Sequence, residues 1–112
     1  MTIAAEFSAV GGYDAARRLL TSTDATAVFV CSDSQSQGVV AAARDLGRVV
    51  PRDVAVIGFD GTSQTQFSEP RLSVVAQPLP EMARAALAAL SDPEQAPPTV
   101  PFELVIRSSC GC

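Results

Sequence analysis

Four polar side chains stand directly after apolar segments, at the points where strands are predicted to end. They are Ser32, Asp33, Asp60 and Gln77. Hydroxyl, carboxylate and amide groups on an apolar scaffold suit the binding of a small molecule with several hydroxyls. Asp33 and Asp60 could also form the carboxylate pair of a glycosidase. That reaction needs one acid kept protonated in apolar surroundings, whereas both residues have Ser, Gly or Thr close by. The residue types therefore favour binding, and we expect a sugar-like ligand.

The apolar segments before these side chains have the pattern of strands in a parallel sheet. Residues 54–57 are apolar without alternation, which is typical of a strand covered on both faces. Residues 27–31 and 72–76 form similar segments. Ligands of open α/β sheets bind outside the carboxyl ends of the strands, so we expect the four polar side chains to converge there. The alternative for Asp60 is an Asp-Gly turn with no partner.

Helices are predicted between the strands. Apolar residues recur with helical spacing over residues 11–21, 35–46 and 78–90. Ser34 is expected to cap the second helix, and Gly47 suits the position that ends it. The third helix is expected to bury a stripe of apolar residues. This stripe comprises Met82, Ala85, Ala86, Ala89 and Leu90.

The last part of the chain is predicted to be a linker followed by a strand. Residues 91–101 contain four prolines and mark the linker, and residues 102–106 form the strand. Helices and strands thus alternate along the chain. The predicted fold class is α/β, a parallel sheet flanked by helices.

Composition excludes several classes of protein. With 112 residues, 47% of them hydrophobic, the chain is about one small domain. Its net charge is −4, with eight scattered Arg and no Lys, so no basic face is available to hold DNA. Neither a membrane-spanning apolar run nor a secretion signal is recognisable, which predicts a cytoplasmic protein.

The inventory of reactive residues predicts that the chain is not an enzyme. Without any His, no Ser-His or Cys-His pair can form, and no glycine-rich phosphate loop occurs. Cys31 falls in a predicted buried strand, while Cys110 and Cys112 stand at the end of the chain. This spacing fits no disulfide framework, and without His or a second cysteine pair it does not suit zinc. We therefore expect a frayed terminus with free thiols, no metal and no cofactor.

Five segments of the chain, in order, resemble the effector-binding domain of the LacI/GalR family of transcriptional regulators, which shares its fold with periplasmic sugar-binding proteins. The segments are residues 12–20, 27–38, 50–60, 70–90 and 103–109. Val-Pro-x-Asp-Val before the 54–57 strand and the terminal Arg-Ser-Ser favour the regulator branch. The alternatives are a fragment of a transport-associated periplasmic-type sugar-binding protein and a stand-alone interaction module.

The resemblance implies a two-lobed receptor that closes on a sugar or related metabolite. It also implies that the α/β fold of this chain, a parallel sheet flanked by helices, is a partial periplasmic-binding-protein-like (type I) lobe. In the family, the residues matched by Asp60 and Gln77 typically hydrogen-bond the ligand. Ser32 stands where the family usually has Asn, so a shorter hydroxyl replaces an amide. This departure predicts an unusual or more loosely held ligand.

The resemblance also implies that residues 1–112 are the carboxyl-terminal portion of an effector-binding domain, with the DNA-binding headpiece and half of the ligand cleft absent. The expected partners are the effector and a second copy of the chain, with DNA bound only through the headpiece and no membrane. Dimerisation is expected through residues 63–71, where Phe67 is the large apolar side chain. Alternatively, Phe67 packs on its own core.

Overall fold

The computed structural model describes residues 1–94 and 98–112, and the elements below refer to these residues. Its helices are α1 (Ala9–Ser22), α2 (Asp33–Asp45) and α3 (Leu79–Ser91). Its strands are β1 (Ala27–Phe29), β2 (Ala55–Asp60), β3 (Ser73–Ala76) and β4 (Glu103–Val105). Two 3₁₀ turns, η1 (Ser63–Gln66) and η2 (Ser108–Cys110), complete the set. Part of the predicted linker, residues 95–97, lies outside the described residues.

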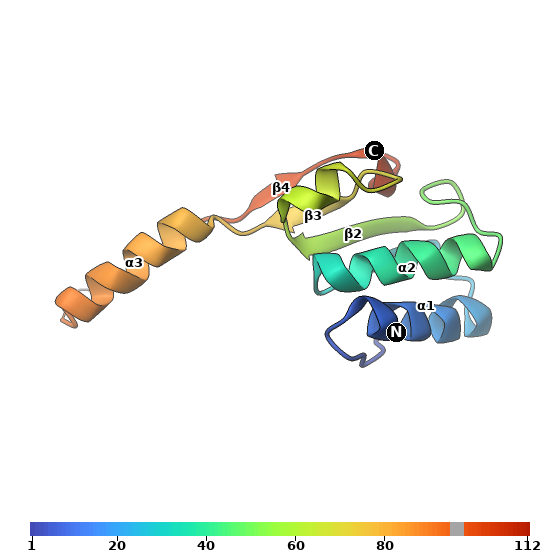
Figure 1. Ribbon diagram of the computed structural model, residues 1–112, viewed down its shortest axis with the longest axis horizontal. Helices are drawn as coiled ribbons and strands as arrows, with labels where there is room; N and C mark the ends of the chain where they lie inside the picture. The colour runs from blue at the N-terminus through green and yellow to red at the C-terminus, as the bar shows by residue number, and fades with distance from the viewer. Residues whose placement is uncertain (95–97) are drawn as a thin grey trace.

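The four strands form one sheet in the order β1-β2-β3-β4. The first three strands are parallel, with Val28 opposite Val56 and Gly58 opposite Val74. β4 runs antiparallel to β3, with Leu104 opposite Val75, because the chain turns back toward the sheet after α3 (Figure 1). The predicted α/β class is confirmed, and the antiparallel last strand is a departure from the predicted parallel sheet.

Helices α1 and α2 cover one face of the sheet (Figure 1). The core lies between them and the strands and is made of small and branched apolar side chains. Its buried members are Ala16, Leu20, Val30, Val39, Ala42, Ala43, Val54, Val56, Leu72 and Val74. On this face of β2 the Val56 side chain is fully buried, whereas Ala55, Ile57 and Phe59 at the alternate positions are half-buried.

The prediction of strands covered on both faces is therefore wrong. Among the described helices, α1 and α2 lie on one side of the sheet and α3 projects away from it (Figure 1), and on β1 the Phe29 side chain is 60% exposed. Cys31 is likewise exposed rather than buried in a strand. A continuous apolar run shows what a strand can bury, and residues 1–94 and 98–112 supply no helix for the second face.

The second helix begins earlier than predicted. Ser32, not Ser34, is the N-cap of α2, and its side-chain oxygen accepts a hydrogen bond from the backbone N–H of Gln35 at 3.2 Å. Ser32 has extended backbone angles as the chain leaves β1, which suits a cap, whereas Ser34 is already helical. Gly47 has φ +72° and follows the helix as predicted.

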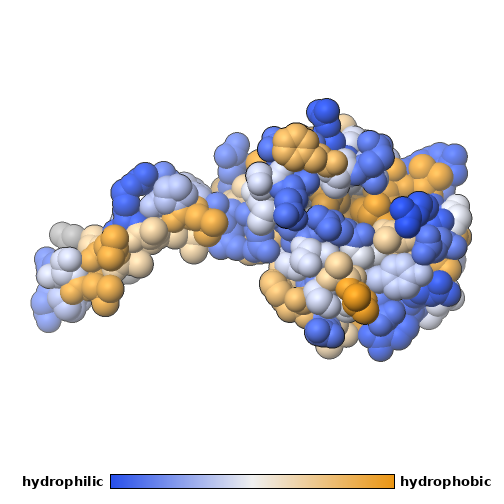
Figure 2. Space-filling model, viewed as in Figure 1, coloured by the Kyte–Doolittle hydropathy of each residue, from blue (hydrophilic) through white to orange (hydrophobic). Residues whose placement is uncertain are grey.

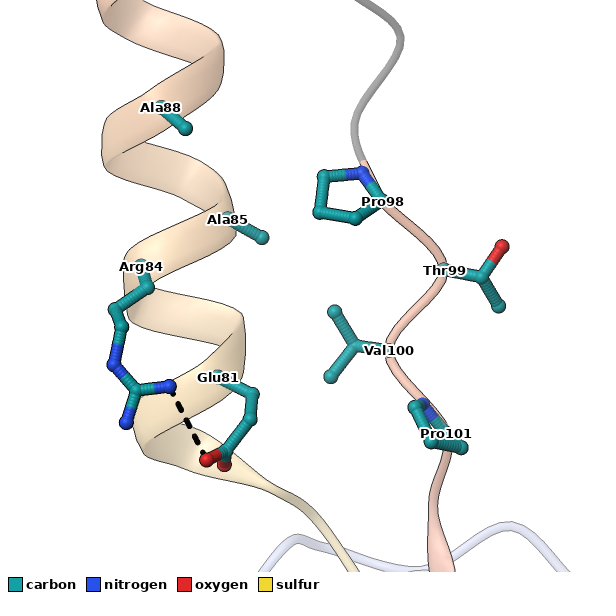
Figure 3. A pocket seen from close by; sticks show the side chains of 8 residues that line it. All are labelled: Glu81, Arg84, Ala85, Ala88, Pro98, Thr99, Val100 and Pro101. Atoms are coloured by element: carbon teal, nitrogen blue, oxygen red, sulfur yellow. Dashed lines mark hydrogen bonds and ion pairs between the residues drawn. The ribbon is translucent and has the colours of Figure 1, made fainter.

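Helix α3 projects away from the sheet (Figure 1). None of its residues is buried, and Leu87 and Leu90 are 65% and 79% exposed. The predicted buried stripe is thus wrong for this structure, and apolar groups are exposed along the projection (Figure 2). A shallow hollow of about 400 Å³ separates α3 from residues 98–101 (Figure 3). Its lining is mainly apolar, and its two charged side chains pair with each other, Arg84 donating to Glu81 at 3.2 Å.

The turn before β2 contains an ion pair that should make stability depend on pH. Arg52 donates two hydrogen bonds to the Asp53 carboxylate, at 2.9 and 3.0 Å, and the Val49 N–H donates a third at 2.8 Å. These bonds, that of Arg52 first, lower the pKa of Asp53 from 3.8 to about 2. A carboxylate with a depressed pKa stabilises the fold above its unfolded pKa, and the contribution disappears as pH falls from about 4 to about 2.

We therefore expect an NMR titration of the Asp53 side-chain carbonyl to give a pKa of about 2. The Asp53→Asn variant should show a smaller loss of stability between about pH 4 and pH 2 than the wild type. An Asp53 pKa close to 3.8 would show that these bonds do not persist in solution.

Candidate functional site

Asp60 and Gln77 meet at the carboxyl ends of β2 and β3. Asp60 is the last residue of β2, and Gln77 follows Ala76, which lies opposite Asp60 in the sheet. The Gln77 Nε2 donates to Asp60 Oδ1 at 2.6 Å, and the Gln77 backbone N–H donates to the Asp60 carbonyl at 2.9 Å. Both side chains are half-buried. Within the described residues, the second carboxylate oxygen of Asp60 and the side-chain oxygen of Gln77 accept no hydrogen bond.

The backbone at Asp60 is strained. Asp60 has φ +111°, a region that residues other than glycine rarely adopt, and Gly61 follows with φ +79°. A Cβ at position 61 would lie 2.6 Å from the Cβ of Ala76, so only glycine fits. Strain of this kind is often found at functional sites, where surrounding contacts maintain it. The sharp turn thus fixes the Asp60 carboxylate at the sheet edge.

Asp33 supports this turn from the start of α2. It is only 4% exposed, and its Oδ2 accepts a hydrogen bond from the backbone N–H of Thr62 at 2.6 Å. Its Oδ1 is buried and has no partner among the described residues. Gly58 lies next to it and makes room for Ser36, because a Cβ at position 58 would lie 2.6 Å from the Ser36 Oγ. Asp33 therefore lies beside the Asp60 turn but is closed off from solvent.

Ser32 is 1% exposed and its hydroxyl is already engaged. Besides capping α2, the Ser32 Oγ donates to the side-chain oxygen of Gln35 at 3.2 Å. The structure thus brings Asp33, Asp60 and Gln77 to one edge of the sheet, as the parallel arrangement predicts. Of the four candidate residues, only Asp60 and Gln77 have free acceptors accessible to a ligand there.

Sequence reasoning missed the side chains that hold this edge in place. The Arg107 guanidinium donates to the Leu72 carbonyl and to the Thr65 hydroxyl, at 2.6 and 3.0 Å. The buried Ser109 hydroxyl donates to the Val56 carbonyl at 2.7 Å. Together they attach the end of the chain to β2, β3 and η1. The terminal Arg-Ser-Ser was recognisable in the sequence, but its partners are too distant along the chain to be inferred.

Phe67 ends the η1 turn and is 82% exposed. The alternative that it packs on its own core is therefore wrong. Its role in a dimer interface stays a prediction.

Two other kinds of site find no support in residues 1–94 and 98–112. No group of three or more His, Cys, Asp and Glu side chains is placed to hold a metal ion. No helix in these segments combines the length and the apolar character needed to cross a membrane.

Residues 2–110 match the model of the periplasmic binding protein-like domain. The chain belongs to this family, in the branch of the LacI-type transcriptional regulators. It is 34% identical to the HTH-type transcriptional regulator MalR of Clostridium butyricum over an alignment of 116 positions, which covers 98% of the chain and 35% of MalR. It is 39% identical to the HTH-type transcriptional repressor CytR of Escherichia coli K12 over 90 positions, or 75% of the chain and 26% of CytR.

Solved structures of LacI-type regulators share the fold. A LacI family regulator from Arthrobacter sp. FB24 in complex with lactose superposes with a TM-score of 0.83 and 31% identity, over 96% of this chain and 43% of that one. A LacI family regulator from Enterococcus faecium with bound ribose gives a TM-score of 0.79 and 29% identity, over 94% and 41%. The chain thus spans well under half the length of these relatives. Members of this family regulate transcription and are not enzymes.

Proposed function

We propose that these residues form one wall of the effector site of a LacI-type regulator, and that the effector is a sugar or a related metabolite with several hydroxyls. The observation that carries the proposal is the Asp60–Gln77 pair, which presents two free acceptors at the carboxyl edge of the sheet. The similar structures with lactose and ribose support a sugar.

The chemistry of the pair fits a ligand with neighbouring hydroxyls. An ionised carboxylate can accept hydrogen bonds but cannot donate them. The Gln77 side-chain amide donates to one of the two Asp60 oxygens and thereby fixes the carboxylate. The second Asp60 oxygen and the Gln77 oxygen can each accept from a hydroxyl. Hydrogen bonds to a charged group are the stronger kind, so Asp60 should be the main contact.

We propose that DNA is bound by a part of the regulator other than these residues. The chain has a net charge of −4, so it should not bind DNA itself, and contact with DNA would come from a separate headpiece in the cytoplasm. Asp33 and Ser32 would act indirectly, by fixing the turn after Asp60 and the start of α2.

A calorimetric screen tests the proposal. The full-length product of the gene that encodes these residues would be titrated with common mono- and disaccharides, and we expect micromolar binding of at least one. Binding of no hydroxyl-rich metabolite, or sugar binding that is indifferent to changes at Asp60, would contradict the proposal.

The 112-residue chain alone should bind the same sugars poorly. Small-molecule sites enclose most of the ligand surface, and this chain presents a single open sheet edge. We expect no shift of its thermal transition in millimolar sugar, because a ligand whose concentration is far below its Kd adds almost nothing to the free energy of unfolding. Clear stabilisation at micromolar sugar would show that the chain forms a complete site.

We also propose that the chain forms a two-fold symmetric homodimer. The uncovered sheet face, the free edge of β1 and the exposed Phe67 all present surface suited to another copy. Light scattering should give a dimer at micromolar concentration, and Phe67→Ser should shift it toward monomer. Leu90→Ser on α3, which is similarly exposed, is the matched control and should not. A wild-type monomer that unfolds cooperatively would contradict the proposal.

A further inference from the structure

The end of the chain, which the effector site does not use, brings two thiols together. Cys110 closes the η2 turn, and Gly111 has φ +75°, which reverses the chain direction. The Cys112 backbone N–H donates to the Cys110 Sγ at 3.3 Å, and the Cys112 Sγ–H donates to the Cys110 carbonyl at 3.9 Å. The Cys110 sulfur therefore lies against the backbone of Cys112, and the Cys112 sulfur lies against the backbone of Cys110.

This terminus is anchored rather than frayed, contrary to the expectation from sequence. Ser109 is fully buried, its N–H donates to the Arg71 carbonyl at 3.0 Å, and its hydroxyl accepts from the Ser73 N–H at 2.8 Å. Cys110 is half-buried on this base, while Cys112 is exposed. The sheet thus fixes one thiol and leaves the other accessible to small molecules.

We propose that Cys110 and Cys112 are a redox-active dithiol that closes to an intramolecular disulfide on reaction with a small disulfide such as oxidised glutathione. The chain reversal at Gly111 holds the backbone of Cys112 against the Cys110 sulfur, so ring closure needs little further ordering of the chain. Exposed or strained disulfides have more oxidising potentials, so the ring should reopen in an excess of reduced glutathione.

The two thiols have different roles. The hydrogen bond from the Cys112 side chain, followed by that from Ser73, lowers the pKa of the Cys110 thiol. The same contact with Cys110 raises the pKa of Cys112. Because the thiolate is the nucleophile, Cys110 attacks first and Cys112 resolves.

The exchange takes place in two steps. The Cys110 thiolate attacks one sulfur of oxidised glutathione, a mixed disulfide forms, and one glutathione thiolate leaves. Cys112, as thiolate, then attacks the Cys110 sulfur, the protein disulfide forms, and the second glutathione leaves. The two protein thiols give up two electrons and two protons, which reduce one glutathione disulfide to two glutathione molecules.

The experiment treats the 112-residue chain with oxidised glutathione and follows free thiols and intact mass. Cys31, which is also an exposed thiol, is replaced by Ser in every chain that is tested, so that it cannot take up glutathione. In the Cys31→Ser chain, both remaining thiols, Cys110 and Cys112, should disappear. The intact mass should fall by two hydrogens, and no glutathione should stay attached. Cys112→Ser, whose hydroxyl can still donate to Cys110, should retain one glutathione on Cys110. Cys110→Ser should react several-fold more slowly at Cys112.

Further measurements separate ring closure from unspecific oxidation. The rate should not depend on protein concentration, and at a fixed glutathione ratio the folded chain should be oxidised several-fold more than the same chain in urea, because the turn positions the thiols. Stable glutathione adducts on both residues, disulfide-linked dimers that increase with concentration, or equal oxidation in urea would each overturn the proposal.

Discussion

Replacing Asp60 by Ala should weaken effector binding by the full-length gene product by ~10–100-fold or more. The Asp60 carboxylate has one oxygen fixed by Gln77 and one free to accept from a ligand hydroxyl. Hydrogen bonds to an ionised group contribute about 1.5–3 kcal/mol each, and the alanine variant loses them. Calorimetry with the sugar that binds the wild-type protein measures the change in Kd.

Asp24→Ala is the matched control for charge. Asp24 is exposed in the loop between α1 and β1, remote from the sheet edge in sequence and structure. Its replacement removes the same charge and should leave the Kd unchanged. Equal affinities of the wild type and the Asp60→Ala variant would remove Asp60 from the site.

Gly61→Ala should lower the free energy of unfolding of the chain by about 3 kcal/mol. Two effects add at this position. The backbone has φ +79°, and the new Cβ would lie 2.6 and 2.7 Å from the Cβ and Cα of Ala76. Because both neighbouring atoms are tied to the backbone of β3, they cannot move aside as a flexible side chain could. Urea denaturation measures the loss as a lower midpoint at unchanged slope.

Gly47→Ala isolates the backbone effect. Gly47 has nearly the same angle, φ +72°, but a Cβ there would have no atom within 4 Å. We expect a cost of only about 1 kcal/mol from the left-handed conformation. If the two variants were equally destabilised, the close contact with Ala76 would not exist in solution.

Local elements were predictable because apolar periodicity reports directly on backbone conformation. Residues 11–21 were expected to be helical, and α1 covers Ala9–Ser22. Residues 54–57 were expected to form a strand, and β2 covers Ala55–Asp60. The edge where Asp60 and Gln77 meet followed from the rule that parallel strands end on the same side.

Burial and long-range contacts were not predictable from the pattern alone. The run 54–57 has the same appearance whether or not a second layer covers the strand, and here that layer is absent from the described residues. The buried role of Asp33 depends on a bond to Thr62, 29 positions along the chain. The apolar stripe on α3 predicted burial, but α3 projects from the sheet and none of its residues is buried within the described part of the chain (Figure 1).

A crystal structure of the full-length gene product with its sugar bound would show whether Asp60 and Gln77 bind the effector. Ligand hydroxyls should lie within hydrogen-bond distance of the free Asp60 oxygen and of the Gln77 side chain, at the carboxyl edge of β2 and β3. A sugar bound elsewhere, with the Asp60–Gln77 pair unchanged and in contact with solvent only, would contradict this prediction.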